Sequence, residues 1–129
     1  MLNVPDAAAM EQIARRAIAD MPDLFRQHLD GVSVHVEEFA DPETLASLGI
    51  GSRWGLLGVY QGRPLTERSI WDSGALSPRI RLFRRPLLSE WVQSGEDIRD
   101  LIVHVLVHEV GHHFGYSDAE MEAIDEAQD

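Results

Sequence analysis

The sequence contains neither cysteine nor lysine, and all eleven of its basic residues are arginine. The absence of cysteine excludes disulfides and thiolate ligands, so nitrogen and oxygen atoms must hold any bound metal. The first twenty residues include several charges, and no stretch of about 20 apolar residues occurs anywhere in the chain. We therefore expect no signal peptide and no membrane contact, and a cytoplasmic location by default.

The chain has 129 residues, which is long enough to bury a core and too short for two ordinary domains. Its content of 44% hydrophobic and 26% charged residues is that of a soluble globular protein. We expect a single domain over residues 1–129. The sequence alone does not indicate an oligomeric state.

The formal net charge is −11, and it is unevenly distributed. Residues 63–85 carry six arginines and two acidic residues, whereas six acidic residues and no basic residue follow Gly115. The simplest interpretation of the arginines is a solvated strand face that pairs with the acidic tail, and the alternative is a positive rim that attracts acidic peptides. The acidic balance of the whole chain argues against nucleic acid as a partner.

Apolar periodicity and turn residues predict an α+β order of elements. Asp6 is a good N-cap for a helix that ends at Pro22, and Pro42 after Asp41 starts a helical turn. The other expected elements are a short helix over 22–29, a strand over 32–36, a strand or hairpin over 56–61, a strand over 79–83, a short helix over 87–93 and a long helix that ends near Phe114. We expect the long helix to be the frame of the functional site.

The long helix contains the run His108-Glu109-Val110-Gly111-His112. Residues four apart lie on the same side of a helix, so His108 and His112 can direct imidazole nitrogens at one ion. Glu109 sits beside the first histidine, where its carboxylate can take a proton from an attacking water. The spacing therefore indicates a metal site with its own general base.

A catalytic zinc site usually needs a third protein ligand, and Asp118 is the obvious candidate. We expect the long helix to start at a capping box over 94–97 and to end at Gly115, whose left-handed conformation lets the chain turn back toward the ion. The alternative is a helix with surface histidines, followed by a helix that Ser117 or Asp118 caps. That alternative does not explain why Glu109 and two histidines share this spacing on an aliphatic stretch.

The other histidines of the long helix are not expected to be ligands. His104 lies about 12 Å from His112 along the axis, too far for both to reach one small ion, so we expect it to pack or to support a ligand. His113 points about 100° away from His112 and is expected to be a structural hydrogen-bonding group. Gly111 inside the helix is expected to allow close approach by a strand or loop.

The extended pattern H-E-x-x-H-x-x-G-x-x-D resembles that of the Asp-zincins, and the chain as a whole is similar to the small bacterial zincin-like metallopeptidases. Further matching segments lie at residues 55–62, 64–69 and 79–83. The resemblance implies a minimal zincin-like fold, with a small mixed sheet packed on helices and a long active-site helix. It also implies one zinc ion with His108, His112 and Asp118 as ligands. Glu109 would be the catalytic acid and base in the hydrolysis of peptide bonds.

Only eleven residues follow Asp118, too few to build the lower wall of a closed peptide cleft. We expect a shallow, open groove in which an extended peptide or unfolded segment adds to an exposed strand edge, as the resemblance implies. Specificity is expected from three places, which are the glycine-rich segment with Trp54 and Trp71, Tyr60 or Tyr116, and the strand over 79–83. Core packing is the simpler interpretation of both tryptophans.

Two other functions remain open. A bacterial ribosomal-RNA-processing endoribonuclease has the same ligand spacing, but its last ligand is a histidine, whereas this chain has Asp118 there and is too acidic for RNA. A non-catalytic module that binds metal or peptide would also keep the fold. Glu109 separates these interpretations best, because a purely structural metal site has no use for it.

Overall fold

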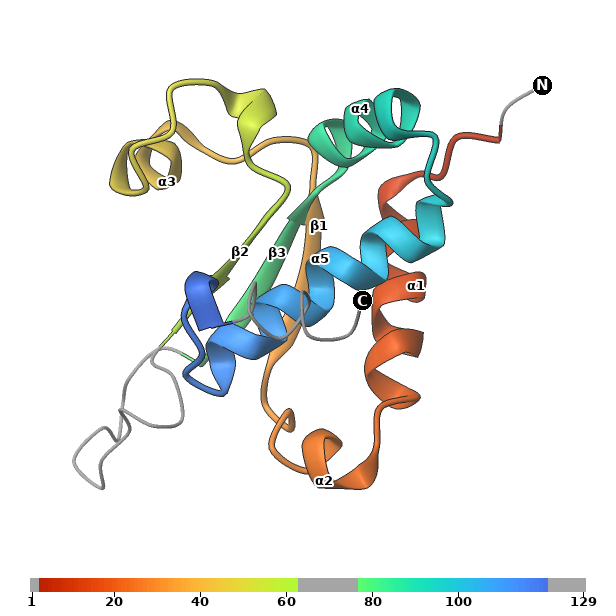
Figure 1. Ribbon diagram of the computed structural model, residues 1–129, viewed down its shortest axis with the longest axis vertical. Coiled ribbons are helices and arrows are strands. Elements are labelled where there is room, and N and C mark those ends of the chain that lie inside the picture. Colours follow the sequence, from red (N-terminus) through yellow and green to blue (C-terminus); the bar gives the residue numbers. More distant parts are fainter. Residues whose placement is uncertain (1–2, 63–76, 121–129) are drawn as a thin grey trace.

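The computed structural model describes residues 3–62 and 77–120, which form helices packed on a small sheet (Figure 1). The elements are α1 (Ala7–Ala19), α2 (Asp23–Arg26), β1 (Ser33–Glu37), α3 (Pro42–Ser47), the 3₁₀ turn η1 (Arg53–Gly55), β2 (Gly58–Gln61), β3 (Arg79–Phe83), α4 (Arg84–Ser94) and α5 (Ile98–His113). The predicted α+β class is confirmed. Within the described ranges, the helices are too short or too polar to span a bilayer.

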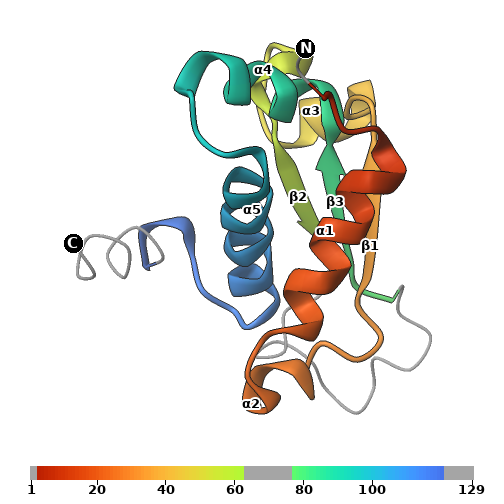
Figure 2. The same cartoon turned by 90° about the vertical axis from the view of Figure 1, so that its right-hand side faces the viewer.

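The three strands form one mixed sheet in the order β1-β3-β2. β1 runs parallel to β3 and β2 runs antiparallel to it, so among the described strands β3 is central and β2 lies at an edge. α1 packs along β1, α5 packs along β2 and β3, and the two helices also contact each other (Figure 2). The sheet therefore places its edge strand β2 against the helix that carries the histidine motif.

The core lies between the sheet and these two helices. Ile80 and Leu82 of β3 are fully buried in one cluster with Met10 of α1 and with Ile102 and Leu106 of α5. Burying a side chain of this size stabilises a fold by about 1.5–3 kcal/mol. α5 is therefore held firmly against the sheet, and the residues of the motif stand on a rigid support.

The helix starts predicted at Asp6 and Asp41 are confirmed. The Asp6 carboxylate accepts a hydrogen bond from the Ala9 N–H at 2.8 Å, and Asp41 accepts one from the Thr44 N–H at 3.0 Å. Pro42 lies in the first turn of α3, where its missing N–H costs nothing. These starts depend only on neighbouring residues, which is why the sequence predicts them.

The capping box predicted at the start of α5 is wrong. Ser94 is the last residue of α4, and Gly95 ends that helix in a left-handed conformation with φ 72°. Asp97 caps α5 directly, because its carboxylate accepts from the N–H groups of Arg99 and Asp100. Two helices meet within this short segment, so Ser94 belongs to the first helix and does not cap the second.

The face of the sheet that points away from α1 and α5 carries a buried arginine. The Arg81 side chain is only 7% exposed, and it donates to Glu37 at 2.8 and 2.9 Å and to Asp41 at 2.7 Å. It also donates to the Thr44 hydroxyl at 3.0 Å. The predicted solvated arginine face is therefore wrong for Arg81, whose carboxylate partners belong to β1 and to the start of α3. Part of the arginine-rich stretch lies outside the described residues.

Candidate metal centre

α5 ends at the glycine that the sequence indicates. The Gly115 N–H donates to the His112 carbonyl at 3.0 Å, and the Tyr116 N–H donates to the Gly111 carbonyl at 3.0 Å. Gly115 is left-handed, with φ 94°. These features form a Schellman motif, which ends the helix and turns the chain back. The predicted role of Gly115 is confirmed.

Another helical turn begins immediately after this motif, at Asp118. The Ser117 hydroxyl accepts from the Glu120 N–H at 3.2 Å, and the Glu120 carboxylate accepts from the Ser117 N–H at 3.2 Å. This reciprocal pair is a capping box, and it places Asp118 at the first helical position. A helix that Ser117 caps is part of the alternative interpretation of the sequence, and that cap is present in the structure.

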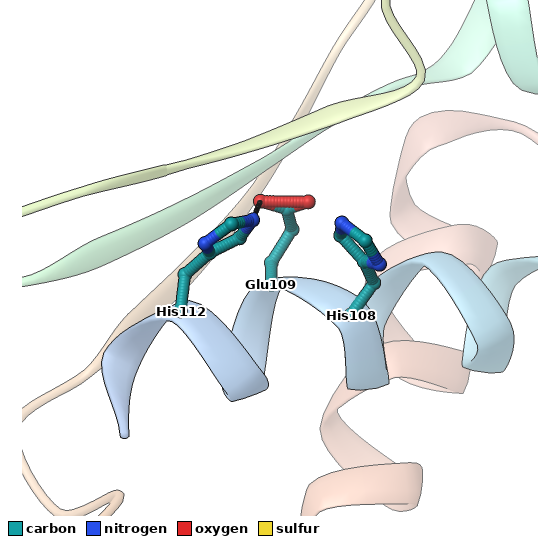
Figure 3. Close-up of side chains that lie close together, drawn as sticks. All are labelled: His108, Glu109 and His112. Carbon is teal, nitrogen blue, oxygen red and sulfur yellow. Dashed lines mark ion pairs between the residues drawn. The ribbon is translucent and has the colours of Figure 1, made fainter. Parts of the chain in front are cut away.

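The turn brings Asp118 to both histidines of the motif. Its Oδ1 atom lies 2.8 Å from Nε2 of His108 and 3.0 Å from Nε2 of His112. The two imidazoles flank the Glu109 carboxylate on one side of α5 (Figure 3). One possible ligand atom from each of His108, Glu109 and His112 lies within 4.8 Å of the others. The structure thus gathers all four residues that the sequence singles out.

The chemistry of this group fits a zinc ion. Tetrahedral zinc has bonds of about 2.0–2.1 Å to nitrogen and oxygen, which separate neighbouring ligand atoms by about 3.3 Å. The contacts of Asp118 with His108 and His112, at 2.8 and 3.0 Å, are close to that separation. A hydrogen bond from His108 holds the pKa of Asp118 below its usual range, which keeps the carboxylate charged as a ligand must be.

Glu109 lies between the two histidines and is only 7% exposed. Burial raises the pKa of Glu109, while the charges that His112 and His108 can carry lower it, as does the Tyr60 N–H that donates to its carboxylate. The raised pKa makes this carboxylate a stronger base than an exposed one. Its position and its basicity both suit Glu109 to proton transfer.

The edge strand β2 approaches α5 closely at the site. A Cβ atom at Gly58 would lie 2.9 Å from Cγ1 of Val105, so only glycine allows the strand this close to the helix. The approach lets the Tyr60 N–H reach the Glu109 carboxylate. Gly58 of the strand allows this contact, and the close approach that the sequence predicts at Gly111 of α5 stays a prediction.

The sequence profile of the zincin-like metallopeptidase family matches residues 29–127, which include every element from β1 to α5. The chain belongs to this family. No curated protein matches it in sequence. Membership confirms the family that the motif predicts and indicates a metal-dependent peptidase, since the family implies a bound metal, typically zinc. Within the described residues, His108, Glu109 and His112 form a group that could hold such a metal.

In this zincin-like chain, His113 is a structural hydrogen-bonding group, as the direction of its side chain on the helix predicts. It is 1% exposed, its Nε2 lies 2.8 Å from the His28 carbonyl oxygen, and its Nδ1 lies 2.8 Å from the Tyr60 hydroxyl. A carbonyl oxygen only accepts, so Nε2 carries a proton, and in the neutral ring the Tyr60 hydroxyl donates to Nδ1. His113 thereby ties β2 and the segment after α2 to the end of α5.

Three expectations about the zincin-like site are wrong. His104 is exposed on α5 and is not packed. The strand over 79–83 is the central strand β3, and none of its residues lines the cleft beside the motif, so the expectation that it contributes to specificity is wrong. Trp54 is 49% exposed and stacks edge-to-face on Phe39, with 4.8 Å between ring centroids, so it does not belong to the core. Trp71 lies outside the described residues.

A cleft of about 590 Å³ adjoins the zincin-like motif. Its polar lining includes the four residues gathered at the end of α5, which are His108, Glu109, His112 and Asp118. Its apolar lining includes Leu48, Ile50, Leu56, Val59 and Tyr116. Sequence reasoning missed Leu48 and Ile50, because they follow α3 and only the fold brings that segment to the motif.

Proposed function

We propose that this chain is a zinc-dependent metalloendopeptidase, with His108, His112 and Asp118 as metal ligands and Glu109 as general base. Family membership supports the class of activity. The observation that carries the residue assignment is the position of Asp118 Oδ1, which lies within 3.0 Å of Nε2 of both histidines. Asp118 thus does more than start the next helical turn, because its carboxylate also lies against both imidazoles.

The mechanism follows from the position of Glu109. A bound zinc ion would polarise the peptide carbonyl and lower the pKa of the attacking water. Glu109 takes one proton from that water as the water oxygen bonds to the carbonyl carbon. The carbon–nitrogen bond then breaks, and Glu109 delivers the proton to the leaving amine. Because burial raises the pKa of Glu109, the group accepts this proton more readily than an exposed carboxylate would.

An extended peptide is the substrate that the edge strand favours. The Phe83 N–H donates to the Leu57 carbonyl at 2.9 Å, which fixes the alternation of hydrogen bonds along β2. Gly58 and Tyr60 are accordingly the residues whose backbone groups turn away from β3, and the Tyr60 N–H meets Glu109 on that edge. A peptide that lies along this edge in extended form would pass the proposed base.

The site does not favour either alternative function. Among the described residues that line the cleft there is no arginine, so the lining offers no guanidinium to a polyphosphate. A metal site with only a structural role would gain nothing from a carboxylate buried between its ligands. The experiment that follows distinguishes the proposed peptidase from the endoribonuclease and from the non-catalytic module.

The test is a comparison of substrates with the same protein. The chain is freed of metal with a chelator, reloaded with zinc, and incubated in parallel with a disordered polypeptide and with single-stranded RNA. We expect zinc-dependent cleavage of the polypeptide and none of the RNA. Metal-dependent cleavage of RNA alone would establish the endoribonuclease. Stoichiometric zinc binding without hydrolysis of any member of a diverse peptide library would establish the binding module.

A further inference from the structure

An apolar wall stands beside the polar residues of the cleft. The wall consists of Leu48, Ile50 and Leu56, which line the same cleft as His108 and Glu109. The Leu48 side chain is exposed, at 47%. Ile50 and Leu56 are half-buried. A single exposed apolar side chain is ordinary, but one that lines a cleft with two further apolar side chains, next to convergent polar groups, has the character of a binding surface.

The end of α3 fixes the backbone of this wall. The Gly49 N–H donates to the Ala46 carbonyl at 3.1 Å, and the Ile50 N–H donates to the Leu45 carbonyl at 2.9 Å. Gly49 is left-handed, with φ 69°. These features form a Schellman motif like the one that ends α5, and it sets the directions in which Leu48 and Ile50 leave the chain.

The start of α3 is fastened to the sheet. Asp41 caps α3 and accepts from Arg81 at 2.7 Å, and Thr44 accepts from the same guanidinium at 3.0 Å. Arg81 is buried and is also paired with Glu37 of β1. Because β3 carries Arg81 and pairs with β2, this clamp fixes the wall relative to the strand that meets Glu109. A surface held in place before binding loses little conformational entropy when a substrate arrives.

The polar lining of the cleft combines two carboxylates with the two histidines of the motif, and a bound zinc ion would offset the negative charge. Glu109 and Asp118 line the cleft, and the Glu120 carboxylate caps the helical turn that begins at Asp118. A polar or charged side chain of a peptide would lose its water against the apolar wall without gaining a hydrogen-bond partner from it. An aliphatic or aromatic side chain would instead remove the wall from water. The cleft therefore distinguishes two chemical classes of side chain.

We infer that the wall selects peptides with an aliphatic or aromatic side chain next to the scissile bond and disfavours peptides with an acidic side chain there. The inference rests on the proposed function and names the substrate class of the same site. Loss of one apolar contact in a pocket changes kcat/KM by roughly 10- to 200-fold. Leu48 is the exposed member of the wall, so its replacement tests the inference with the least effect on folding.

The experiment uses peptides of one length that carry leucine, phenylalanine, serine or glutamate on either side of the scissile bond. Their kcat/KM values are measured with the zinc-loaded wild type, Leu48→Ser, Leu48→Met and Leu24→Ser. Leu24 of α2 is 68% exposed and does not line the cleft, so it is the matched control. We expect the wild type to prefer the leucine and phenylalanine peptides over the glutamate peptide by about 10-fold or more. Leu48→Ser should lose most of this preference, whereas Leu48→Met and Leu24→Ser should keep it.

A binding measurement separates the inference from the proposed function. Each peptide is titrated by fluorescence anisotropy into zinc-loaded Glu109→Gln and into the same variant with Leu48→Ser. Equal affinity for all four peptides, or a preference that Leu48→Ser leaves unchanged, would overturn the inference. If the wild type cleaved no peptide, the proposed function would fail, and the titration would still decide whether the wall selects apolar side chains.

Discussion

The Oδ1 atom of Asp118 lies 2.8 Å from Nε2 of His108, although a helix end separates the two residues. Two local structural motifs produce this contact. Gly115 ends α5 in a left-handed conformation, and the capping box of Ser117 and Glu120 then holds Asp118 at the start of the next helical turn. A carboxylate that is distant along the helix direction is thereby returned to the histidines.

The capping box should contribute to metal affinity through Asp118. Glu120→Ala removes the acceptor for the Ser117 N–H and loosens Asp118, so we expect zinc affinity to fall by about 10-fold. Glu120→Gln should retain wild-type affinity, because glutamine also completes a capping box. Asp118→Ala should lose more zinc affinity than either Glu120 variant. Competition with a chromophoric chelator measures all three, and a Glu120→Ala protein with wild-type affinity would show that the box does not position Asp118.

The close approach of β2 to α5 should depend on Gly58. A Cβ atom there would meet Val105, so Gly58→Ala should push the strand away from the helix and destabilise the fold by about 1–3 kcal/mol. Gly51→Ala is the matched control, because a Cβ atom at Gly51 meets nothing within 4 Å. Gly51→Ala should change the free energy of unfolding by no more than about 0.5 kcal/mol. Equal unfolding midpoints of the two variants in urea would contradict this account of the contact.

The Arg81 clamp should weaken in acid. The hydrogen bond from Arg81 lowers the pKa of Glu37 from its ordinary value of 4.5. A carboxylate whose pKa is lower in the folded state stabilises the protein at pH values above its ordinary pKa. That stabilisation is lost as the pH falls through the folded-state pKa. Glu37→Gln should therefore destabilise the protein at neutral pH, by only about 1 kcal/mol because the Glu37 side chain is 43% exposed.

The difference in stability between wild type and Glu37→Gln should shrink as the pH falls from 4.5 through the lowered folded-state pKa, below which Glu37 is protonated in the folded protein too. Urea unfolding at a series of pH values measures it. Glu90→Gln, at an exposed position of α4, is the control and should follow the wild type at every pH. If Glu37→Gln were less stable than wild type by the same amount at every pH, the ion pair with Arg81 would not be the cause of the lost stability.

Local signals predicted the helix ends and the motif. Asp6, Asp41 and Gly115 act on backbone groups within a few residues, so their patterns carry the information needed. The spacing of His108 and His112 is likewise a property of one helix, and the structure brings their imidazoles together. Ser117 caps the next helical turn, as the alternative interpretation of this segment predicts, whereas the capping box predicted at the start of α5 is not formed.

Features that depend on pairing between distant segments could not be predicted. Alternation over 79–83 predicted a strand, but the carboxylates that bury Arg81 come from β1 and α3, which the pattern of one strand does not reveal. The order β1-β3-β2 decides that β2 is the edge beside the motif. For the same reason, Leu48 and Ile50 reach the cleft only through the packing of the whole fold.

The central claim is that Glu109 moves the proton at a zinc site that His108, His112 and Asp118 hold. Glu109→Gln tests it most directly, because glutamine keeps the size of the side chain and cannot accept the proton. Zinc content after loading and hydrolysis of a disordered polypeptide are measured for both proteins. We predict one zinc ion per chain in each protein and a loss of hydrolysis on the order of 10² to 10⁴ in the variant. Wild-type turnover by Glu109→Gln would contradict the account.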